Sequence, residues 1–320
     1  MTPDILVEQA ADRLRGFTVR TPYEQSPGLS QFLGTAVWTK GEHRQHTGSF
    51  KLRGAFNKLL GLSDADRKRG VVAASSGNHG AAVAYACAAL NIAGKVYVPE
   101  GASSAKLKKI RDQGAEVVLF GSDGLDTEIE ARRMAEVLGA TYVSPYNDPD
   151  VVAGQGTVAL EMLQTGPTPD VVYVAVGGGG LIGGIARYLA DIAPATRIVG
   201  ALPANSPVMA ESVKAGRIVE MPWLATLSDG TAGGIEPGAI TFDICRQFVH
   251  EWVTVTEGEI AEAMRLWARG SDEPIEGAAA VAIAALLRDA GRLHDVRVAV
   301  VICGGNVSRE VWQGVVGGSR

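Results

Sequence analysis

The segment Val171-Val-Tyr-Val-Ala-Val-Gly-Gly-Gly-Gly-Leu-Ile-Gly-Gly184 is the most informative stretch of this chain. Its β-branched first half predicts a buried strand, because such residues pack well on a pleated surface. The glycines that follow predict a tight turn into a helix. A strand, a glycine-rich turn and a helix in this order are typical of a parallel sheet wrapped by helices.

Two other segments repeat this order. Ser75-Ser-Gly-Asn-His-Gly80 follows a candidate strand that starts at Val71, and Cys303-Gly-Gly-Asn306 follows one that starts at Arg297. The carboxyl ends of parallel strands meet at one edge of a sheet, where ligands bind. We therefore expect the three small-residue loops to form the walls of one pocket.

The rest of the chain also alternates between short β-rich runs and helical stretches, which predicts an α/β fold. The expected strands cover residues 71–75, 95–98, 116–120, 171–176, 197–202 and 297–302. The expected helices cover residues 81–90, 104–113, 128–138, 153–163 and 257–268. The sequence shows no repeat and no obvious linker, so any second domain must be interleaved with the first.

The composition narrows the class of protein. With 46% hydrophobic and 20% charged residues, the chain can bury a substantial core. A net charge of −5 without a basic stripe argues against a nucleic-acid partner. The absence of a signal sequence and of a bilayer-spanning run predicts a cytoplasmic protein without a membrane partner. Cys87, Cys245 and Cys303 are odd in number and lack C-x-x-C spacing, which argues against disulfides and zinc.

The glycine run predicts an anion site. Gly177 to Gly180 place several backbone N–H groups at a helix start, where the helix dipole favours a phosphate. Gly178, Gly180 and Gly183 also match G-x-G-x-x-G, but a dinucleotide site needs an acidic residue at the end of the next strand. That strand ends Gly200-Ala-Leu-Pro203, so a single cofactor phosphate is favoured over NAD. The alternative is a tight turn that binds no ligand.

The segment Thr47-Gly-Ser-Phe-Lys-Leu-Arg-Gly54 places Lys51 just inside the start of an expected helix. The helix dipole disfavours a cation there, so the amine is easier to deprotonate. Only a neutral amine can attack an aldehyde. Taken alone, the segment favours a solvated surface lysine, which is the commonest position of lysines; the other motifs of the chain reverse this preference.

These segments, taken in order, resemble the serine/threonine dehydratase and serine racemase family of fold-type II pyridoxal phosphate enzymes. The motifs are Gly48-Ser-Phe-Lys-Leu-Arg-Gly-Ala55, Ser75-Ser-Gly-Asn-His-Gly80, Gly177-Gly-Gly-Gly-Leu181 and Cys303-Gly-Gly-Asn306. The resemblance implies two interleaved domains, each with a largely parallel twisted sheet flanked by helices. A large cofactor-binding domain would comprise residues 1–66 and 149–320, and a small mobile domain residues 67–148. A homodimer is the family expectation.

The resemblance also implies how pyridoxal 5′-phosphate is bound. Lys51 would hold it as a Schiff base with Phe50 packed behind, and Asn78 would hydrogen-bond its 3′-oxygen. Gly177, Gly178, Gly179, Gly180 and Leu181 would cradle the phosphate. Cys303 would face the pyridine nitrogen, and Gly230 and Glu276 would line the ring.

For the substrate, the resemblance implies that backbone donors of Ser75, Ser76, Gly77, Asn78 and His79 bind the carboxylate. The His79 side chain would contribute by packing and not as an acid or base. The expected reaction is removal of water and ammonia from a β-hydroxy amino acid such as L-threonine, L-serine or 3-hydroxyaspartate, with Lys51 as the base. A neutral thiol at Cys303 supports a pyridinium poorly, which favours elimination over transamination.

Two alternatives remain open. Ser76 matches the serine that racemases of the family place opposite the lysine, so the chain could be an amino acid racemase; Ser76 could equally serve only in carboxylate binding. A catalytically inactive, regulatory pyridoxal phosphate-binding protein is the alternative from another class. Damage at Lys51 or Asn78 would be its signature, and both residues are present.

The chain departs from the family pattern in places. Leu202 and Val208 stand where metal-activated racemases carry carboxylates, so we expect that divalent-metal site to be missing. The glycine-rich run from Leu227 to Gly238 resembles a subgroup that includes dehydratases of hydroxyectoine catabolism, which leaves the substrate open. Arg132 and Arg133 match the neighbourhood of a substrate-binding arginine, and Arg133 is our candidate for a second substrate carboxylate; a solvated helix face is the alternative.

Overall fold

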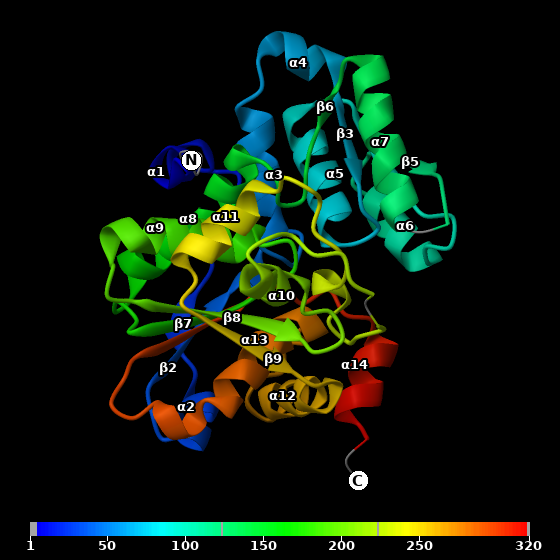
Figure 1. Cartoon of the computed structure of the whole chain (residues 1–320). Helices are drawn as coiled ribbons and strands as arrows, with labels where there is room; N and C mark the ends of the chain where they lie inside the picture. The colour runs from blue at the N-terminus through cyan, green and yellow to red at the C-terminus, as the bar shows by residue number, and fades with distance from the viewer. Residues whose placement is uncertain (1–4, 123, 223, 319–320) are drawn as a thin grey trace.

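The computed structural model describes residues 5–122, 124–222 and 224–318. Within these ranges the strands form two sheets, of which one has the order β1-β2-β10-β7-β8-β9 and the other the order β5-β4-β3-β6 (Figure 1). All neighbouring strands are parallel except β1, which runs antiparallel to β2. The strands are β1 Tyr23–Gln25, β2 Val37–Gly41, β3 Val71–Ala74, β4 Gly94–Val98, β5 Glu116–Leu119, β6 Thr141–Tyr142, β7 Val171–Ala175, β8 Arg197–Pro203, β9 Glu251–Val255 and β10 Val298–Ile302.

Helices connect and cover the strands. The α-helices are α1 Val7–Arg13, α2 Pro27–Leu33, α3 Lys51–Leu60, α4 Asp64–Arg69, α5 Asn78–Leu90, α6 Ser104–Arg111, α7 Gly124–Leu138, α8 Pro149–Thr165, α9 Gly180–Ile192, α10 Val208–Ala215, α11 Ile240–Phe248, α12 Glu257–Gly270, α13 Gly277–Arg288 and α14 Arg309–Val316. Three short 3₁₀ helices of the described chain are η1 Glu42–Arg44, η2 Asp229–Thr231 and η3 Ala290–Arg292. Among the described residues, none of these helices combines the length and apolarity needed to cross a bilayer.

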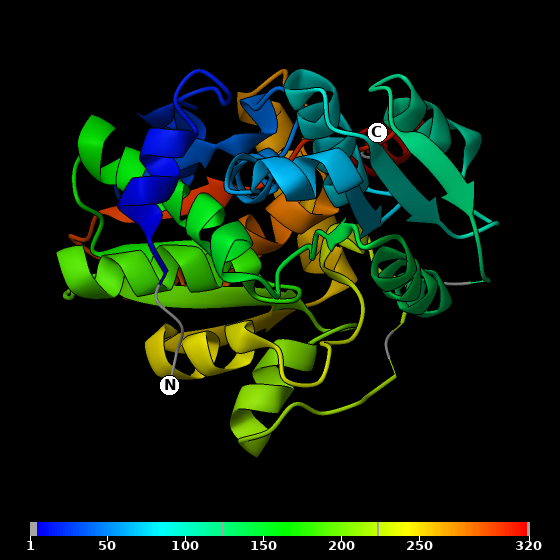
Figure 2. The ribbon, with the colours of Figure 1, turned by 90° about the horizontal axis from the view of Figure 1, so that it is seen from above.

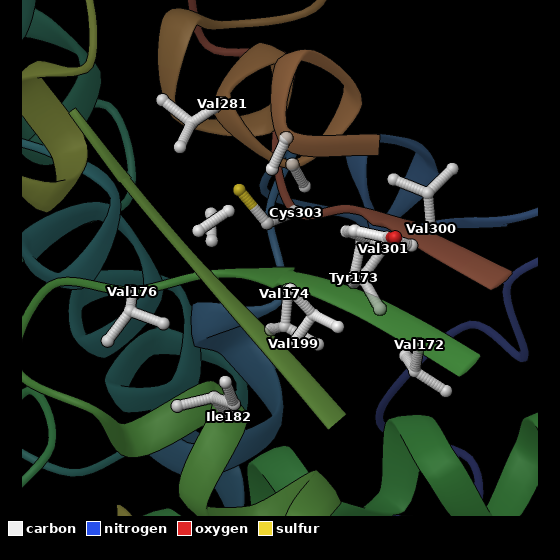
Figure 3. Packing of buried hydrophobic residues seen from close by; sticks show 14 of the residues in the cluster. Val172, Tyr173, Val174, Val176, Ile182, Val199, Val281, Val300, Val301 and Cys303 are labelled. Carbon is white, nitrogen blue, oxygen red and sulfur yellow. The ribbon is translucent and has the colours of Figure 1, made fainter. Parts of the chain in front are cut away.

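The larger sheet carries the main core. Its central strands β7 and β10 are buried along their whole length, which explains their unbroken apolar sequences. Helices α8 and α9 cover one face and α13 covers the other (Figure 1). Figure 3 shows side chains of this core, with Cys303 just beyond β10 among Val174, Val281 and Val301.

The smaller sheet packs helices on both faces because its side chains alternate in direction. Val96 and Val98 pack with Ala84 and Ile110 of α5 and α6, whereas Tyr97 packs on the α7 side. Figure 2 shows these cyan and teal elements grouped at one side of the molecule. All four strands fall between Val71 and Tyr142. The sheet therefore lies within the range expected for the small domain, whose mobility stays a prediction.

A buried ion cluster anchors helix α3, the helix that starts at Lys51. Arg53 donates to Glu42 on η1 and to Glu161 on α8, at 2.7 Å each. Lys40 of β2 completes the cluster at 2.6 Å from Glu161. Arg53, Lys40 and Glu42 are all fully buried. Because an unpaired charge is costly in the interior, the cluster holds α3, α8 and β2 in fixed relative positions.

Candidate active site

The site lies where the carboxyl ends of strands from both sheets meet, around Lys51. The backbone before Lys51 is joined to the loop after β10: Phe50 N donates to Cys303 O at 3.1 Å, and Ser49 forms a β-bridge with Gly304. Gly48 permits the approach with a φ of 75°. The Lys51 ammonium donates to Pro145 O at 2.9 Å and lies 5.2 Å from the centre of the Phe50 ring.

Burial lowers the pKa of Lys51 to about 8, and the nearby Cys303 and Glu276 oppose this only in part. Desolvation penalises the charged form of an amine, whereas its neutral form loses little on burial. A substantial share of this side chain is therefore a neutral nucleophile near physiological pH. The structure thus supplies the reactive form of the amine without a neighbouring base.

The loop after β7 presents a set of unpaired donors. The backbone N–H groups of Gly177 to Leu181 donate to no acceptor among the described residues. Helix α9 begins at Gly180, so its dipole points its positive end at the same place. Gly179 turns the chain with a φ of 86°. Free N–H groups at a helix N-terminus are suited to an anion of phosphate size.

The glycines of this loop are required by close neighbours. A Cβ on Gly178 would lie 2.4 Å from the Tyr146 ring, and one on Gly177 would lie 3.0 Å from the backbone of Thr231. The Thr241 hydroxyl donates to Gly178 O at 2.7 Å and secures the turn. A side chain at these positions would therefore displace the walls of the cradle.

A second set of unpaired donors follows β3. The N–H groups of Ser76, Asn78, His79 and Gly80 have no acceptor within the described part of the chain, and they stand at the start of α5. Ser75 N donates to a backbone carbonyl of β4, and Gly77 N donates to the Ser75 hydroxyl at 3.1 Å. The loop can therefore receive a second anion, such as a carboxylate, on four of its backbone donors.

A polar relay links this loop to the segment after β10. Asn78 Nδ2 donates to both carboxylate oxygens of Glu276, at 2.9 and 3.0 Å. Asn78 Oδ1 accepts from Asn306 Nδ2 at 2.6 Å. A Cβ on Gly304 would lie 2.5 Å from the Glu276 carboxylate, and one on Gly230 would lie 3.6 Å from it. The structure thus brings Gly230, Glu276, Asn78 and the Cys303 loop together.

The matching family model, described as "Pyridoxal-phosphate dependent enzyme", covers residues 14–304. The chain belongs to this family. An L-threonine ammonia-lyase of Thermotoga maritima is 40% identical over 301 residues, which are 94% of this chain and 75% of the relative. An L-threo-3-hydroxyaspartate ammonia-lyase of a Pseudomonas species is 38% identical over 98% of both chains. The structure of maize serine racemase superimposes with a TM-score of 0.92 and 31% identity, over 98% of this chain and 97% of that one.

The residues present fit pyridoxal phosphate. The described residues offer an amine of lowered pKa and two sets of free backbone donors, which suit an aldehyde, a phosphate and a carboxylate. The buried hydroxyls of Thr47 and Ser49, just before Lys51, have no partner among the described residues. Buried polar atoms are normally paired in proteins. The two unpaired hydroxyls next to Lys51 indicate that a polar ligand binds there in the functional enzyme.

Burial also shifts the pKa values of Cys303 and Glu276. Burial, followed by the Glu276 carboxylate, raises the pKa of the Cys303 thiol well above its ordinary value, so this thiol stays neutral. Burial also raises the pKa of Glu276, although hydrogen bonding by Asn78 acts in the opposite direction. The environment that the family resemblance assigns to the pyridine nitrogen thus holds a neutral thiol and one carboxyl.

The His79 ring is buried and hydrogen-bonded to Val143 O at 2.8 Å. Burial, with a smaller effect of Lys51, lowers the pKa of His79 to about 3, so the ring stays neutral and its Nε2 donates to that carbonyl. A ring locked in this way is suited to packing. This geometry agrees with the expectation that His79 contributes no acid or base.

Arg133 is the candidate that the structure does not bring to the site. Its side chain is 58% exposed and pairs with Glu130 on the same helix face at 2.7 Å. The neighbouring Arg132 instead stacks 4.2 Å over the Tyr142 ring and pairs with Glu128 and Glu236. The helical repeat explains the difference, because consecutive residues point about 100° apart. In this conformation Arg132, and not Arg133, faces the glycine-rich segment from Leu227 to Gly238.

Sequence reasoning assigned no role to Pro145, Tyr146 or Thr241. Pro145 O accepts from Lys51, and Tyr146 packs against Gly178 while its hydroxyl accepts from Glu236 N at 2.9 Å. The short strand β6 that precedes Pro145 and Tyr146 has only two residues and a weak sequence signal. The position of these two residues after a strand would have been the available clue, because ligands bind at strand carboxyl ends, whereas Thr241 at the start of α11 offered no such clue.

Proposed function

We propose that this pyridoxal phosphate enzyme is an ammonia-lyase that converts a β-hydroxy amino acid into a 2-keto acid and ammonia. The observation that supports this proposal most directly is a lysine whose amine is buried and has a lowered pKa, in a chain that also presents two groups of unpaired backbone donors. The names of the relatives support L-threonine, L-serine or 3-hydroxyaspartate as the substrate class. Water lost in the elimination is regained when the nitrogen is released, so the net products are the keto acid and ammonia.

Each chain residue has a defined task in this reaction. The free N–H groups of Gly177 to Leu181 hold the cofactor phosphate, and those of the loop from Ser76 to Gly80 hold the substrate carboxylate. When bound, pyridoxal phosphate supplies an electron sink that acidifies the α-hydrogen of the amino acid. The Lys51 amine, once free, accepts that proton at Nζ, because burial lowers its pKa to about 8 and leaves a substantial neutral fraction near that pH. The neutral Cys303 thiol offers only a weak hydrogen bond and no compensating charge.

Trapping the cofactor on the protein tests its position. We expect borohydride reduction to leave a mass tag on the peptide that contains Lys51 and to abolish the visible absorbance. Lys51→Ala is expected to carry no tag, while Lys58→Ala, seven residues further along the same helix, keeps it. A tag found on a different lysine of the wild-type protein would overturn the assignment.

A substrate panel tests the reaction. L-threonine, L-serine and both diastereomers of 3-hydroxyaspartate are assayed for ammonia and keto acid, with magnesium and with a chelator. Leu202 and Val208 are buried apolar residues, so we expect no dependence on magnesium from that position. A protein that carries the cofactor yet releases no ammonia from any substrate would favour the inactive, regulatory alternative.

Racemisation is the second candidate activity. The Ser76 hydroxyl forms no hydrogen bond among the described residues, which leaves it free to return a proton to Cα. Chiral chromatography after incubation in heavy water separates the activities, because inversion with deuterium uptake and no ammonia identifies a racemase. Ser76→Ala is expected to remove inversion while elimination persists.

The proposal extends to the oligomeric state, the cellular location and the mobility of the small domain. We propose a homodimer and a cytoplasmic location, together with a small mobile domain of residues 67–148. Light scattering at several concentrations tests the dimer. Hydrogen exchange with and without substrate tests the mobility of the domain, since closure would protect peptides of residues 67–148.

A further inference from the structure

Helix α6 of the four-stranded sheet carries Lys106, Lys108 and Lys109, and these three lysines have different partners. Lys108 is 74% exposed and pairs with Asp112 on its own helix. Lys106 reaches Asp229 of η2 at 3.2 Å. Lys109 is half-buried and reaches the two loops that flank Lys51. Three lysines within four residues of the sequence thus have different surroundings, and Lys109 is directed at the loops that flank Lys51.

Lys109 touches the polar relay of the site directly. Its ammonium donates to Asn306 Oδ1 at 2.5 Å and to Thr47 O at 3.4 Å. Asn306 Nδ2 donates in turn to Thr47 O at 2.9 Å and to Asn78 Oδ1 at 2.6 Å. Lys109 therefore stands at the start of a chain of hydrogen bonds that passes through Asn306 and Asn78 to Glu276.

The Lys109 ammonium determines which groups donate and which accept along this series of hydrogen bonds. An ammonium can only donate, so Asn306 must turn its carbonyl oxygen toward Lys109 and its amide nitrogen toward Asn78. Asn78 must then accept with its oxygen and present its own amide nitrogen as a donor to Glu276. An unconstrained amide can exchange its oxygen and nitrogen, and the Glu276 carboxylate, which only accepts, imposes the same orientation on Asn78 from the other end of the chain. The Thr47 carbonyl favours the same orientation of Asn306.

Lys109 loses part of the hydration of its ammonium, which a lysine with no role beyond solubility would keep. Burial lowers the pKa of Lys109, and the Glu276 carboxylate offsets this in part. Among the described residues no carboxylate lies within salt-bridge distance of its ammonium, and its partners there are neutral oxygens. A partly desolvated cation with neutral partners polarises them, which strengthens the next hydrogen bond in the chain.

We propose that Lys109 is a positioning residue that, through Asn306, fixes Asn78 with its amide nitrogen as a donor directed into the active site. The proposal concerns cofactor binding and holds for any of the candidate substrates. It also links the four-stranded sheet to the site, since α6 must be packed against the Thr47 and Asn306 loops for the relay to be complete.

The test compares Lys109→Met, Lys109→Arg and the matched control Lys108→Met in the full-length holoenzyme. We expect Lys109→Met to weaken cofactor binding about tenfold, as for loss of a hydrogen bond to a charged group, and to shift the cofactor absorbance maximum. Lys109→Arg, which keeps a donor, is expected to recover binding to within about threefold. Lys108→Met is expected to match the wild type. Equal cofactor affinity and absorbance in Lys109→Met and Lys108→Met would overturn the proposal.

A second pair of variants separates direction from simple packing. Asn306→Asp keeps an acceptor for Lys109 but removes the donor to Asn78, so we expect a loss at least as large as in Lys109→Met. Adding Lys109→Met to Asn306→Ala, which leaves Lys109 no side chain to act through, is expected to cause little further loss, whereas additive losses would contradict a relay. In the cofactor-free protein, Lys109→Met is expected to increase hydrogen exchange in the peptides around Thr47 and Asn306, whereas Lys108→Met is expected to leave it unchanged. Affinity, absorbance and exchange report on the relay even if no substrate of the panel is turned over.

Discussion

At the scale of single residues, desolvation determines the reactivity of the site. Lys51 has an ordinary chemical structure, and its lowered pKa arises because the surrounding chain excludes water from its ammonium. Cys303 shows the same effect with the opposite sign, since burial raises its pKa and keeps the thiol neutral. An amine that loses its proton easily and a thiol that keeps its own are therefore placed in one site by the same cause.

The pH dependence of cofactor attachment follows from the pKa of Lys51. Since this pKa is lowered to about 8, the neutral amine appears as pH rises through about 8 and not only near the ordinary value of 10.5. At neutral pH its neutral fraction exceeds that of an exposed lysine by roughly two orders of magnitude. The rate of cofactor recapture by cofactor-free protein is expected to rise with a midpoint near pH 8 in stopped-flow absorbance. A midpoint above pH 10 would contradict the desolvation argument.

The glycine cradle can be tested with one added methyl group. Gly178→Ala places its Cβ 2.4 Å from the Tyr146 ring, so the loop or the ring must move. We expect the cofactor dissociation constant to rise at least tenfold, as measured by equilibrium dialysis, because the phosphate donors are displaced. Gly314→Ala on α14 is the control, since a Cβ there meets no atom within 4 Å. Its cofactor affinity is expected to stay unchanged.

At the scale of elements, the active-site helix α3 is held by buried charge. Arg53→Met would leave Glu42 and Glu161 with Lys40 as their only buried cation among the residues that the structure describes. We expect a loss of about 3–5 kcal/mol in the free energy of unfolding by urea, typical of breaking a buried pair. The exposed Arg309→Met is expected to change it by less than about 0.5 kcal/mol. Similar losses in both variants would show that the buried cluster has no special role.

The same cluster has a defined pH dependence. Burial acts to raise the pKa of Glu42, but Arg53 and Lys40 hold it below the ordinary value of 4.5. The ionised Glu42 carboxylate therefore stabilises the folded state above pH 4.5. This stabilisation is lost as pH falls through the lower pKa that Glu42 has in the folded protein. Acid unfolding of the wild type is expected to show this loss. The Arg53→Met variant, which lacks the main partner, is expected to show a smaller dependence on pH in this window.

Helix α7 bears on substrate choice. The single guanidinium of Arg132 serves the two carboxylates of Glu128 and Glu236, so it has no free charge for a second substrate carboxylate. We expect Glu236→Gln to raise kcat/KM for 3-hydroxyaspartate relative to threonine severalfold, because it releases the arginine. Glu130→Gln, which releases the exposed Arg133, is the matched comparison. A change in selectivity confined to Glu130→Gln would restore Arg133 as the substrate residue.

At the scale of the whole molecule, the two sheets meet at the site through cations of one and acceptors of the other. Lys106 pairs with Asp229, Lys109 with Asn306, and Arg132 with Glu236. The Lys106–Asp229 pair is exposed, and exposed ion pairs are weak and screened by salt. Raising the salt concentration to about 1 M is therefore expected to increase hydrogen exchange in the peptide of residues 227–238. The core peptide of residues 171–175 should be unaffected, and an equal rise there would indicate general loosening.

The sequence predicted the central strands and the loops that follow them, because buried parallel strands carry unbroken apolar runs that end in glycine. It did not predict β1, β2, β6 or β9. Strand β2 contains Thr39 and Lys40, which look like surface residues until Glu42 and Glu161 are placed beside them. The short strand β6 has only two residues to signal it. A strand whose burial depends on residues far away in the sequence has no clear apolar pattern of its own, so it is hard to predict.

By itself, the sequence determined the α/β class and the family and singled out the candidate lysine and glycine turns, since these depend on local backbone requirements and on short ordered motifs. Only the tertiary structure decided which polar groups share the pocket and what charge they carry. Lys109 and Arg132 turn toward the site while Lys108 and Arg133 turn to solvent, although each pair is adjacent in the chain. Burial, and with it the pKa of Lys51, is a property of everything packed around a residue, so no short segment can encode it.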